Sequence, residues 1–157
     1  MEEFKAQNAD LTWEEVDNDS STILVAVDVW LSGYSTTAVA SFNPKGELLY
    51  GGYELDAQTE DHQYYYSFKQ WKKGLTKKYG QPDSDDAVWY VDSWKGFPNE
   101  WGYALSKGDV EFQAIWVLED NTRILLIASG GNYKAETSLV YYSEEAVELL
   151  ESKESGF

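Results

Sequence analysis

Hydrophobic side chains recur every three or four positions between residues 59 and 82, in the stretch TEDHQYYYSFKQWKKGLTKKYGQP. Phe68, Trp71 and Leu75 lie on one face at this spacing, which is the period of an amphipathic helix. The pattern predicts a long helix over about residues 60–79 with its apolar face buried. Because segments that alternate like strands flank this helix on both sides, we expect a sheet packed against it.

Both ends of the predicted helix are marked in the sequence. Thr59 is expected to cap the first turn, because a threonine hydroxyl can accept a hydrogen bond from a free backbone N–H there. Gly80 adopts left-handed backbone angles without strain, and Pro82 lacks the N–H that a further turn would need. These two residues predict where the helix ends.

Apolar and polar residues alternate in several further segments, as they do in half-buried strands. Most of these segments are separated by short turns, which favours antiparallel pairing. The glycine pair Gly51–Gly52 predicts a bulge or a close backbone approach. The predicted strands are 22–33, 35–42 and 46–55 before the long helix, and 87–92, 109–118, 122–130 and 134–143 after it.

In the first predicted strand, strict alternation would place Val25, Val27 and Val29 on one face. Asp28 and Trp30 would then share the opposite face. A carboxylate beside a tryptophan indicates that this second face is only partly buried.

Three shorter stretches complete the outline. The apolar residues of segment 11–16 predict one short helical turn, and the acidic run at 83–86 predicts a loop. Ser143 is expected to cap a C-terminal helix over 144–153, whose first two residues are glutamates suited to the positive end of the helix dipole.

These elements predict an α+β fold in which antiparallel sheet meanders pack on a central helix at about residues 60–79, with a short C-terminal helix. Residues 1–157 fit a single domain. A helix followed by a strand meander occurs twice in outline, so two similar halves, 1–56 and 57–157, that share one core are the alternative.

The chain of 157 residues is rich in aromatic side chains, with 7 Trp, 12 Tyr and 6 Phe. These side chains bring large apolar areas, so we expect a stable core without disulfides. The chain has no cysteine, which excludes disulfide bonds, thiolate metal ligands and a cysteine nucleophile.

Acidic residues dominate the charge, because 28 Asp and Glu against 12 Lys and Arg give a formal net charge of −16. Phosphate contacts require Lys and Arg, so no nucleic-acid partner is expected, and a protein with a basic surface is the favoured partner. The predicted long helix is locally basic. We interpret its Lys-rich face as solvated, with a dimer contact or a site for an acidic ligand as alternatives.

No stretch approaches the ~20 consecutive apolar residues of a membrane helix, so membrane insertion is not expected. The first ten residues, MEEFKAQNAD, are acidic and polar, unlike a signal peptide. This favours a cytoplasmic location for the sequence as given. A secreted or lipid-anchored location stays open for a form that has been trimmed.

Residues for the common kinds of catalysis are scarce. His62 is the only histidine, and its place among acidic residues at the start of a helix is typical of a surface residue. Without a second His or a Cys there is no Ser-His-Asp triad, Cys-His pair or nitrogen-rich zinc site. No cofactor, metal site or catalytic residue is predicted, and we expect a non-enzymatic protein. A hydrolase with paired carboxylates, Asp28 or Glu100 among them, is an alternative.

The irregular stretch SWKGFPNEWGYALSKG at 93–108 holds four aromatic residues and a glutamate. Trp and Tyr supply contact area at low entropic cost, so aromatic side chains beside acidic ones on a loop are typical of a binding surface. The alternative is a loop that folds over the open sheet and closes a second small core. The candidate partner-binding residues are Asp28, Trp30, Trp94, Phe97, Glu100, Trp101 and Tyr103.

Structural residues between positions 46 and 143 form a recognisable pattern: Leu75, Tyr79, Gly80, Pro82, Trp89, Ala104, Leu105, Gly108, Trp116, Thr122, Ile124, Tyr141 and Tyr142. The first four make a helix end of the form L-x-x-x-Y-G-x-P. This pattern resembles a family of small, uncharacterised α+β proteins of Gram-positive bacteria. The resemblance implies a compact fold of sheet and helix. That family has no assigned activity, so the resemblance implies none.

Charge and aromatic content together favour a binding module that engages a basic protein, as inhibitor-type and immunity-type proteins do. A secreted or cell-surface module that binds a glycan or peptide on Trp30, Trp94 and Trp101 is the second hypothesis. The acid-pair hydrolase is the third.

Overall fold

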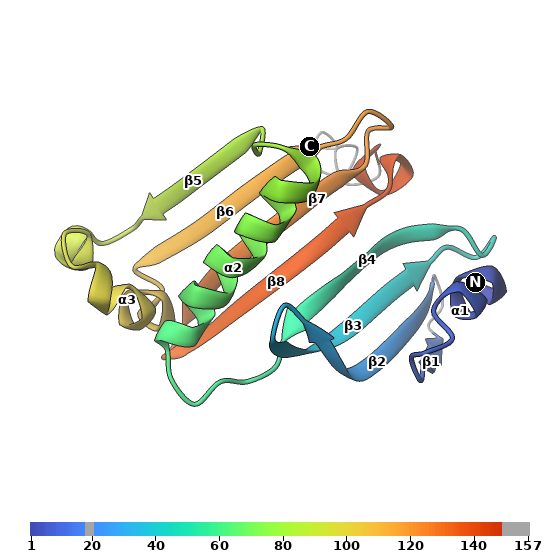
Figure 1. Ribbon diagram of the computed structural model, residues 1–157, viewed down its shortest axis with the longest axis horizontal. Coiled ribbons are helices and arrows are strands. Elements are labelled where there is room, and N and C mark those ends of the chain that lie inside the picture. The colour runs from blue at the N-terminus through green and yellow to red at the C-terminus, as the bar shows by residue number, and fades with distance from the viewer. Residues whose placement is uncertain (18–20, 149–157) are drawn as a thin grey trace, which may run out of the picture.

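The computed structural model describes residues 1–17 and 21–148, and within them eight strands form one antiparallel sheet (Figure 1). The strand order is β1-β2-β3-β4-β8-β7-β6-β5, so the two halves of the chain meet where β4 pairs with β8. The predicted α+β class, with its antiparallel sheet, central helix and short C-terminal helix, is confirmed. The elements are α1 (Glu2–Gln7), β1 (Glu14–Asp17), β2 (Thr22–Leu31), β3 (Tyr34–Phe42), β4 (Leu48–Leu55), α2 (His62–Tyr79), β5 (Ser84–Trp89), the 3₁₀ turns η1 (Asp92–Trp94) and η2 (Pro98–Glu100), α3 (Trp101–Lys107), β6 (Val110–Val117), β7 (Arg123–Gly131) and β8 (Lys134–Tyr142), followed by helical residues 144–148.

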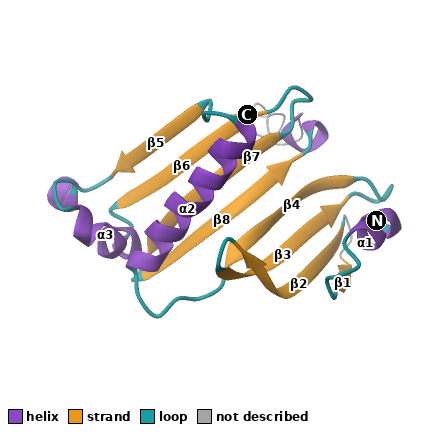
Figure 2. Cartoon of the chain, viewed as in Figure 1, coloured by secondary structure: helices purple, strands orange, loops and turns teal. Residues whose placement is uncertain are grey.

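Helix α2 packs across β7 and β8 and is the central helix that the sequence predicts (Figure 2). Its side chains Phe68, Trp71 and Leu75 are buried, as the three-four spacing requires. They meet the alternating apolar residues of the sheet, among which Trp116 and Leu126 are at most 1% exposed. The indole N–H of Trp116 donates to the carbonyl of Gly80 at 2.9 Å, which fixes the end of α2 against β6.

The helices share one face of the sheet and leave part of that face without a helix. Residues paired across neighbouring strands point to the same face of the sheet. Ala40 pairs with Gly51, and Gly51 pairs with Tyr141, which lies beside Tyr79 of α2, so all three are on the face that α2 covers. On the N-terminal half the same side receives α1, whose Phe4 ring lies 5.5 Å from that of Phe42. Between α1 and α2 no described helix covers β4 (Figure 2).

The ends of α2 agree with the sequence only at the C-terminus. Gly80 has a φ of 85°, a left-handed value, and its N–H donates to the carbonyl of Thr76. At the other end the prediction is wrong, because the residue before the first turn is Asp61 and no side chain, neither its own nor that of Thr59, caps the helix.

Two short segments differ from the sequence prediction. The helical turn expected at 11–16 is absent, since Glu14–Asp17 form the edge strand β1 and the helix lies earlier, at Glu2–Gln7. The loop expected at 83–86 belongs largely to β5, because its residues pair with Gln113 to Ile115 of β6. In both places strand pairing with a distant segment overrides the local pattern.

A bulge in β2 corrects the predicted faces of that strand. The register against β3 shifts between Ala26 and Val29, and Asp28 adopts a φ of 55° inside this bulge. The extra residue returns Val29 to the buried face with Ala26, while Val27 and Trp30 are exposed. Val25, Val27 and Val29 therefore do not share a face. β1 pairs only with residues 22–25 of β2, so the rest of that edge of β2 has no partner strand among the described residues. The bulge and the charge of Asp28 make this edge less suited to pairing with another chain.

Gly52 allows the two halves of the sheet to join. A Cβ atom added there would lie 2.2 Å from the carbonyl oxygen of Leu139 on β8, which is far inside contact distance. At Gly51, the next residue, an added Cβ would lie 3.5 Å from the nearest atom, an ordinary contact. The close approach expected from this glycine pair is confirmed at Gly52.

The two glycines form a matched pair for testing the junction. We predict that Gly52→Ala lowers the free energy of unfolding by about 2 kcal/mol or more, because β4 and β8 must move apart. Gly51→Ala should change it by less than about 1 kcal/mol. Urea unfolding followed by circular dichroism measures both, and equal effects would contradict the close approach.

Candidate functional site

Helix α3 is fixed closely against its neighbours, which makes it a rigid platform at one end of the sheet. A Cβ on Gly102 would lie 2.5 Å from the backbone of His62, and one on Gly130 would lie 2.0 Å from the carbonyl oxygen of Leu105. These two glycines allow α3 to pack against the start of α2 and against β7. Ala104 and Leu105 of the same helix are fully buried.

Trp101 belongs to the packing beneath this platform. Its ring lies 5.4 to 5.7 Å from the rings of Tyr65, Trp89 and Phe112. Its indole N–H donates to the carbonyl of Trp94 at 3.1 Å and so holds the preceding loop in place. Trp101 therefore supports the candidate site from below.

Three other predicted residues, Trp94, Phe97 and Tyr103, come together at the surface. A fourth residue joins them from the turn between β7 and β8. The ring of Trp94 lies 6.4 Å from Phe97 and 5.7 Å from Tyr103, both nearly perpendicular to it. Tyr103 lies 6.4 Å from Tyr133, in the turn between β7 and β8. Phe97 is 60% and Tyr133 is 68% exposed. We call Trp94, Phe97, Tyr103 and Tyr133 the aromatic cluster.

Tyr133 was missed from the sequence because the turn that holds it is thirty residues from Tyr103. In the structure Asn132 and Tyr133 form a tight turn in which both have positive φ, at 52° and 61°. A tyrosine in such a turn is not part of the alternation of buried and exposed residues in the flanking strands, so its side chain can lie at the surface.

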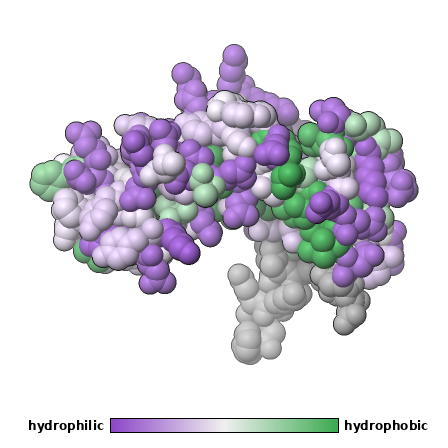
Figure 3. Space-filling view, turned by 90° about the horizontal axis from the view of Figure 1, so that it is seen from below, coloured by the Kyte–Doolittle hydropathy of each residue, from purple (hydrophilic) through white to green (hydrophobic). Residues whose placement is uncertain are grey.

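The remaining predicted residues lie apart from the cluster or at its margin. Glu100 is exposed at the N-terminus of α3. Asp28 and Trp30 lie on β2, the second strand of the sheet, whereas the cluster adjoins β5 to β8. Trp30 is 71% exposed, beside the bulge. On the one face that Figure 3 shows, strongly hydrophobic side chains gather on this half of the molecule, whereas the half with α3 is mostly pale or hydrophilic.

A further hollow, of about 430 Å³, has three acidic residues in its lining, Glu54, Asp61 and Glu136, and Lys134 and Tyr133 line it as well. In the part of the chain that the structure describes, no group of three His, Cys, Asp or Glu side chains is arranged to hold a metal ion. His62 pairs with Glu60 at 3.1 Å and lies edge-on to the ring of Tyr66.

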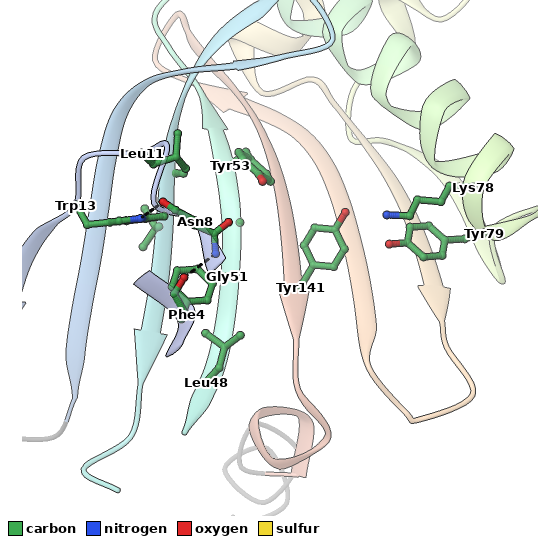
Figure 4. Close-up of a pocket in the computed structure, with 13 residues that line it drawn as sticks. Phe4, Asn8, Leu11, Trp13, Leu48, Gly51, Tyr53, Lys78, Tyr79 and Tyr141 are labelled. Atoms are coloured by element: carbon green, nitrogen blue, oxygen red, sulfur yellow. Dashed lines mark hydrogen bonds between the residues drawn. The ribbon is translucent and has the colours of Figure 1, made fainter. Parts of the chain in front are cut away.

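A groove occupies the region of β4 that no described helix covers (Figure 4). It consists of two adjoining hollows of about 300 and 340 Å³. Both are lined by Tyr53 of β4, Tyr141 of β8 and Lys78 of α2. We call this the central groove.

The phenol of Tyr141 in the central groove remains protonated at neutral pH, because burial and the neighbouring phenols of Tyr79 and Tyr53 raise its pKa. In Figure 4 the hydroxyl of Tyr79 and the ammonium of Lys78 both point from α2 toward Tyr141. The groove thus gathers hydrogen-bond donors.

Comparison with protein-family models, with curated proteins and with solved structures gives no match. The resemblance to small Gram-positive α+β proteins stays a prediction. Among the described helices, none combines the length and the hydropathy that a bilayer span requires.

Because Trp101 is packed beneath the cluster and Phe97 is exposed on it, we predict that replacing them has very different effects on the free energy of unfolding. Trp101→Ala should lower the free energy of unfolding by about 3 kcal/mol, because it leaves a cavity among three rings. Phe97→Ala should change it by no more than about 0.5 kcal/mol, since its ring is mostly in solvent. Chemical denaturation of both variants checks this, and a large loss for Phe97→Ala would show that its ring belongs to the core.

Proposed function

We propose that this protein is a non-enzymatic interaction module that binds a basic protein through the aromatic cluster and the adjoining edge of β5. The observation that carries the proposal is the grouping of exposed apolar side chains. Twelve large hydrophobic residues are exposed in the described chain, and half of them lie here. These are Val88, Tyr90, Val91, Phe97, Tyr103 and Tyr133.

The geometry of the cluster suits an anchor for a partner. Its rings contact one another edge to face, and α3 beneath them is fixed by Gly102 and Gly130. A side chain that is already held in place loses little entropy on binding, which is why Trp and Tyr are common at interface hot spots.

Charge supports a basic partner. Between residues 83 and 100 the chain has five acidic residues and one lysine, and Asp86 and Asp92 are exposed there. One of the five, Asp85, is paired with Lys72 of α2. Of the remaining carboxylates, Asp92 and Glu100 lie in the segment that holds Trp94 and Phe97, whereas Asp83 immediately precedes β5 and Asp86 lies within it. Together they would steer a cationic surface toward this edge and the cluster.

The open edge adds hydrogen-bonding groups to this surface. β5 is the last strand of the sheet, and it pairs only with β6 in the described structure. An extended segment of a partner can add to such an edge through main-chain hydrogen bonds. Asp85 and Asp86 on the edge discourage pairing between copies of this acidic chain and favour a segment with positive charge.

Trp30 favours a second candidate function, the binding of a glycan or peptide. Its ring is 71% exposed, more than that of any other large hydrophobic residue described. It lies on β2 and not with Trp94, so the platform for such a ligand would be formed by Trp30 and Val27 without the aromatic cluster.

For the third hypothesis, the acid-pair hydrolase, the carboxylates to substitute first are those that line the hollow around Glu54.

The proposed interface predicts a loss of capture in one double variant. Tagged protein, incubated with lysate and culture supernatant of the cells that encode it, should retain a basic protein at low salt. The variant Phe97→Ala/Tyr133→Ala should retain at least about tenfold less, because it removes two exposed anchors. Quantitative mass spectrometry of proteins bound to each form measures the ratio.

A matched control separates this surface from the alternatives. Trp30→Ala removes an equally exposed aromatic residue from the other half of the sheet and should retain the same protein as the wild type. Salt of about 0.5 M should release it, because screening weakens the charge attraction. Equal capture by the Phe97→Ala/Tyr133→Ala variant, or loss in Trp30→Ala alone, would contradict the proposed site.

A further inference from the structure

Among the residues that the structure describes, no acidic side chain lines the central groove, although the sequence has 28 Asp and Glu residues. Lys78 is the only charged residue of the described chain that lines either hollow. No carboxylate of the described residues lies within 4.0 Å of the Lys78 ammonium. The groove is therefore a local positive site on an anionic molecule.

Lys78 is accompanied by phenol hydroxyls that can donate to the same group. Tyr79 is the last residue of α2, and its phenol lies close enough to that of Tyr141 on β8 to raise the pKa of Tyr141. Tyr53 comes from β4, the neighbouring strand, and lines both hollows. Three phenols and an ammonium from three elements thus face one space (Figure 4). Charge-assisted hydrogen bonds of this kind hold a carboxylate well.

The walls on the α1 side are mostly apolar, and the one polar side chain among the described lining residues there, Asn8, donates its amide N–H to the carbonyl of Phe4 at 2.9 Å. Leu11 and Trp13 lie beside the groove with Phe4 of α1, and the Trp13 indole N–H is already engaged by the carbonyl of Asn8 at 3.3 Å. The floor is open at Gly51, which has no side chain to fill the space. An aromatic or branched aliphatic group of a ligand would bury its surface here.

We infer that the central groove binds a small amphipathic carboxylate, with its charged end at Lys78, Tyr79 and Tyr141 and its apolar end against Leu11 and Trp13. Hollows of about 300 and 340 Å³ are within the usual size of small-molecule sites. The same chemistry occurs in a free organic acid and in the C-terminal residue of a peptide. This inference is independent of the proposed protein interface, which lies at α3 and β5.

The test is a titration with 1-naphthylacetate, followed by amide chemical shifts of the isotope-labelled protein. Shifts should concentrate at Gly51, the Trp13 indole and Tyr141, with a Kd of about 1 mM or tighter. The neutral isostere 1-naphthylacetamide should bind at least about tenfold more weakly, because it lacks the charge. A second titration with N-acetyl-Ala-Ala-Trp, against its C-terminal amide, distinguishes a peptide end from a free acid by the tighter Kd.

Neighbouring lysines provide a matched control. Lys78→Met should weaken naphthylacetate binding by about tenfold and leave the amide unaffected, whereas Lys77→Met, an exposed residue that lines neither hollow, should change neither. Tyr141→Phe keeps the ring and should also weaken the carboxylate selectively. Shifts scattered over the surface, equal binding of acid and amide, or equal effects of the two lysine variants would overturn the inference.

Discussion

The pairing of β4 with β8 is the contact on which the rest of the structure depends. Residues Tyr50 to Glu54 pair with Ser138 to Tyr142, and this single junction unites a four-stranded N-terminal half with a four-stranded C-terminal half. Without it, each half would expose the edge of a central strand, with its row of unpaired N–H and C=O groups. Tyr53 strengthens the union, because its ring packs against the large core under α2 and against the smaller cluster around Ala26 and Ala38.

The same junction explains where both candidate sites lie. α2 and α3 cover the C-terminal half, α1 covers part of the N-terminal half, and the strand between them keeps an open face, which becomes the central groove. The aromatic cluster lies at the far end, where α3 closes the core and its outer side chains have no further element to pack against. The aromatic cluster is exposed and has carboxylates nearby, whereas the central groove is concave and is lined by a single charged residue of the described chain, Lys78. Their chemistry therefore suits different partners.

The sequence predicts most of the fold because its strongest signals are local. The three-four period of α2, the stop at Gly80 and the alternation in β6, β7 and β8 each depend on neighbouring residues, and the structure confirms them. The errors arise where distant pairing decides. Residues 14–17 form a strand because β2 offers them a partner, and Asp28 leaves the alternation because a bulge forms in β2.

For the candidate site the same division holds. The crowding of aromatic residues at 93–108 is visible in the sequence, and Trp94, Phe97 and Tyr103 do meet there. The sequence does not separate Trp101, which supports the loop from below, from its exposed neighbours. It also gives no sign that Tyr133, thirty residues from Tyr103, joins them. Nor does it show that Tyr53, Lys78 and Tyr141 face one groove, because these three residues converge only through the β4–β8 pairing.

The most direct test of this central pairing is amide hydrogen exchange, residue by residue, across β4 and β8. If the eight strands form one cooperative sheet, the hydrogen-bonded amides of residues 50–54 should exchange as slowly as those that join β7 and β8. Fast exchange throughout residues 50–54, beside slow exchange in β7 and β8, would contradict a continuous sheet. It would also remove the floor of the central groove.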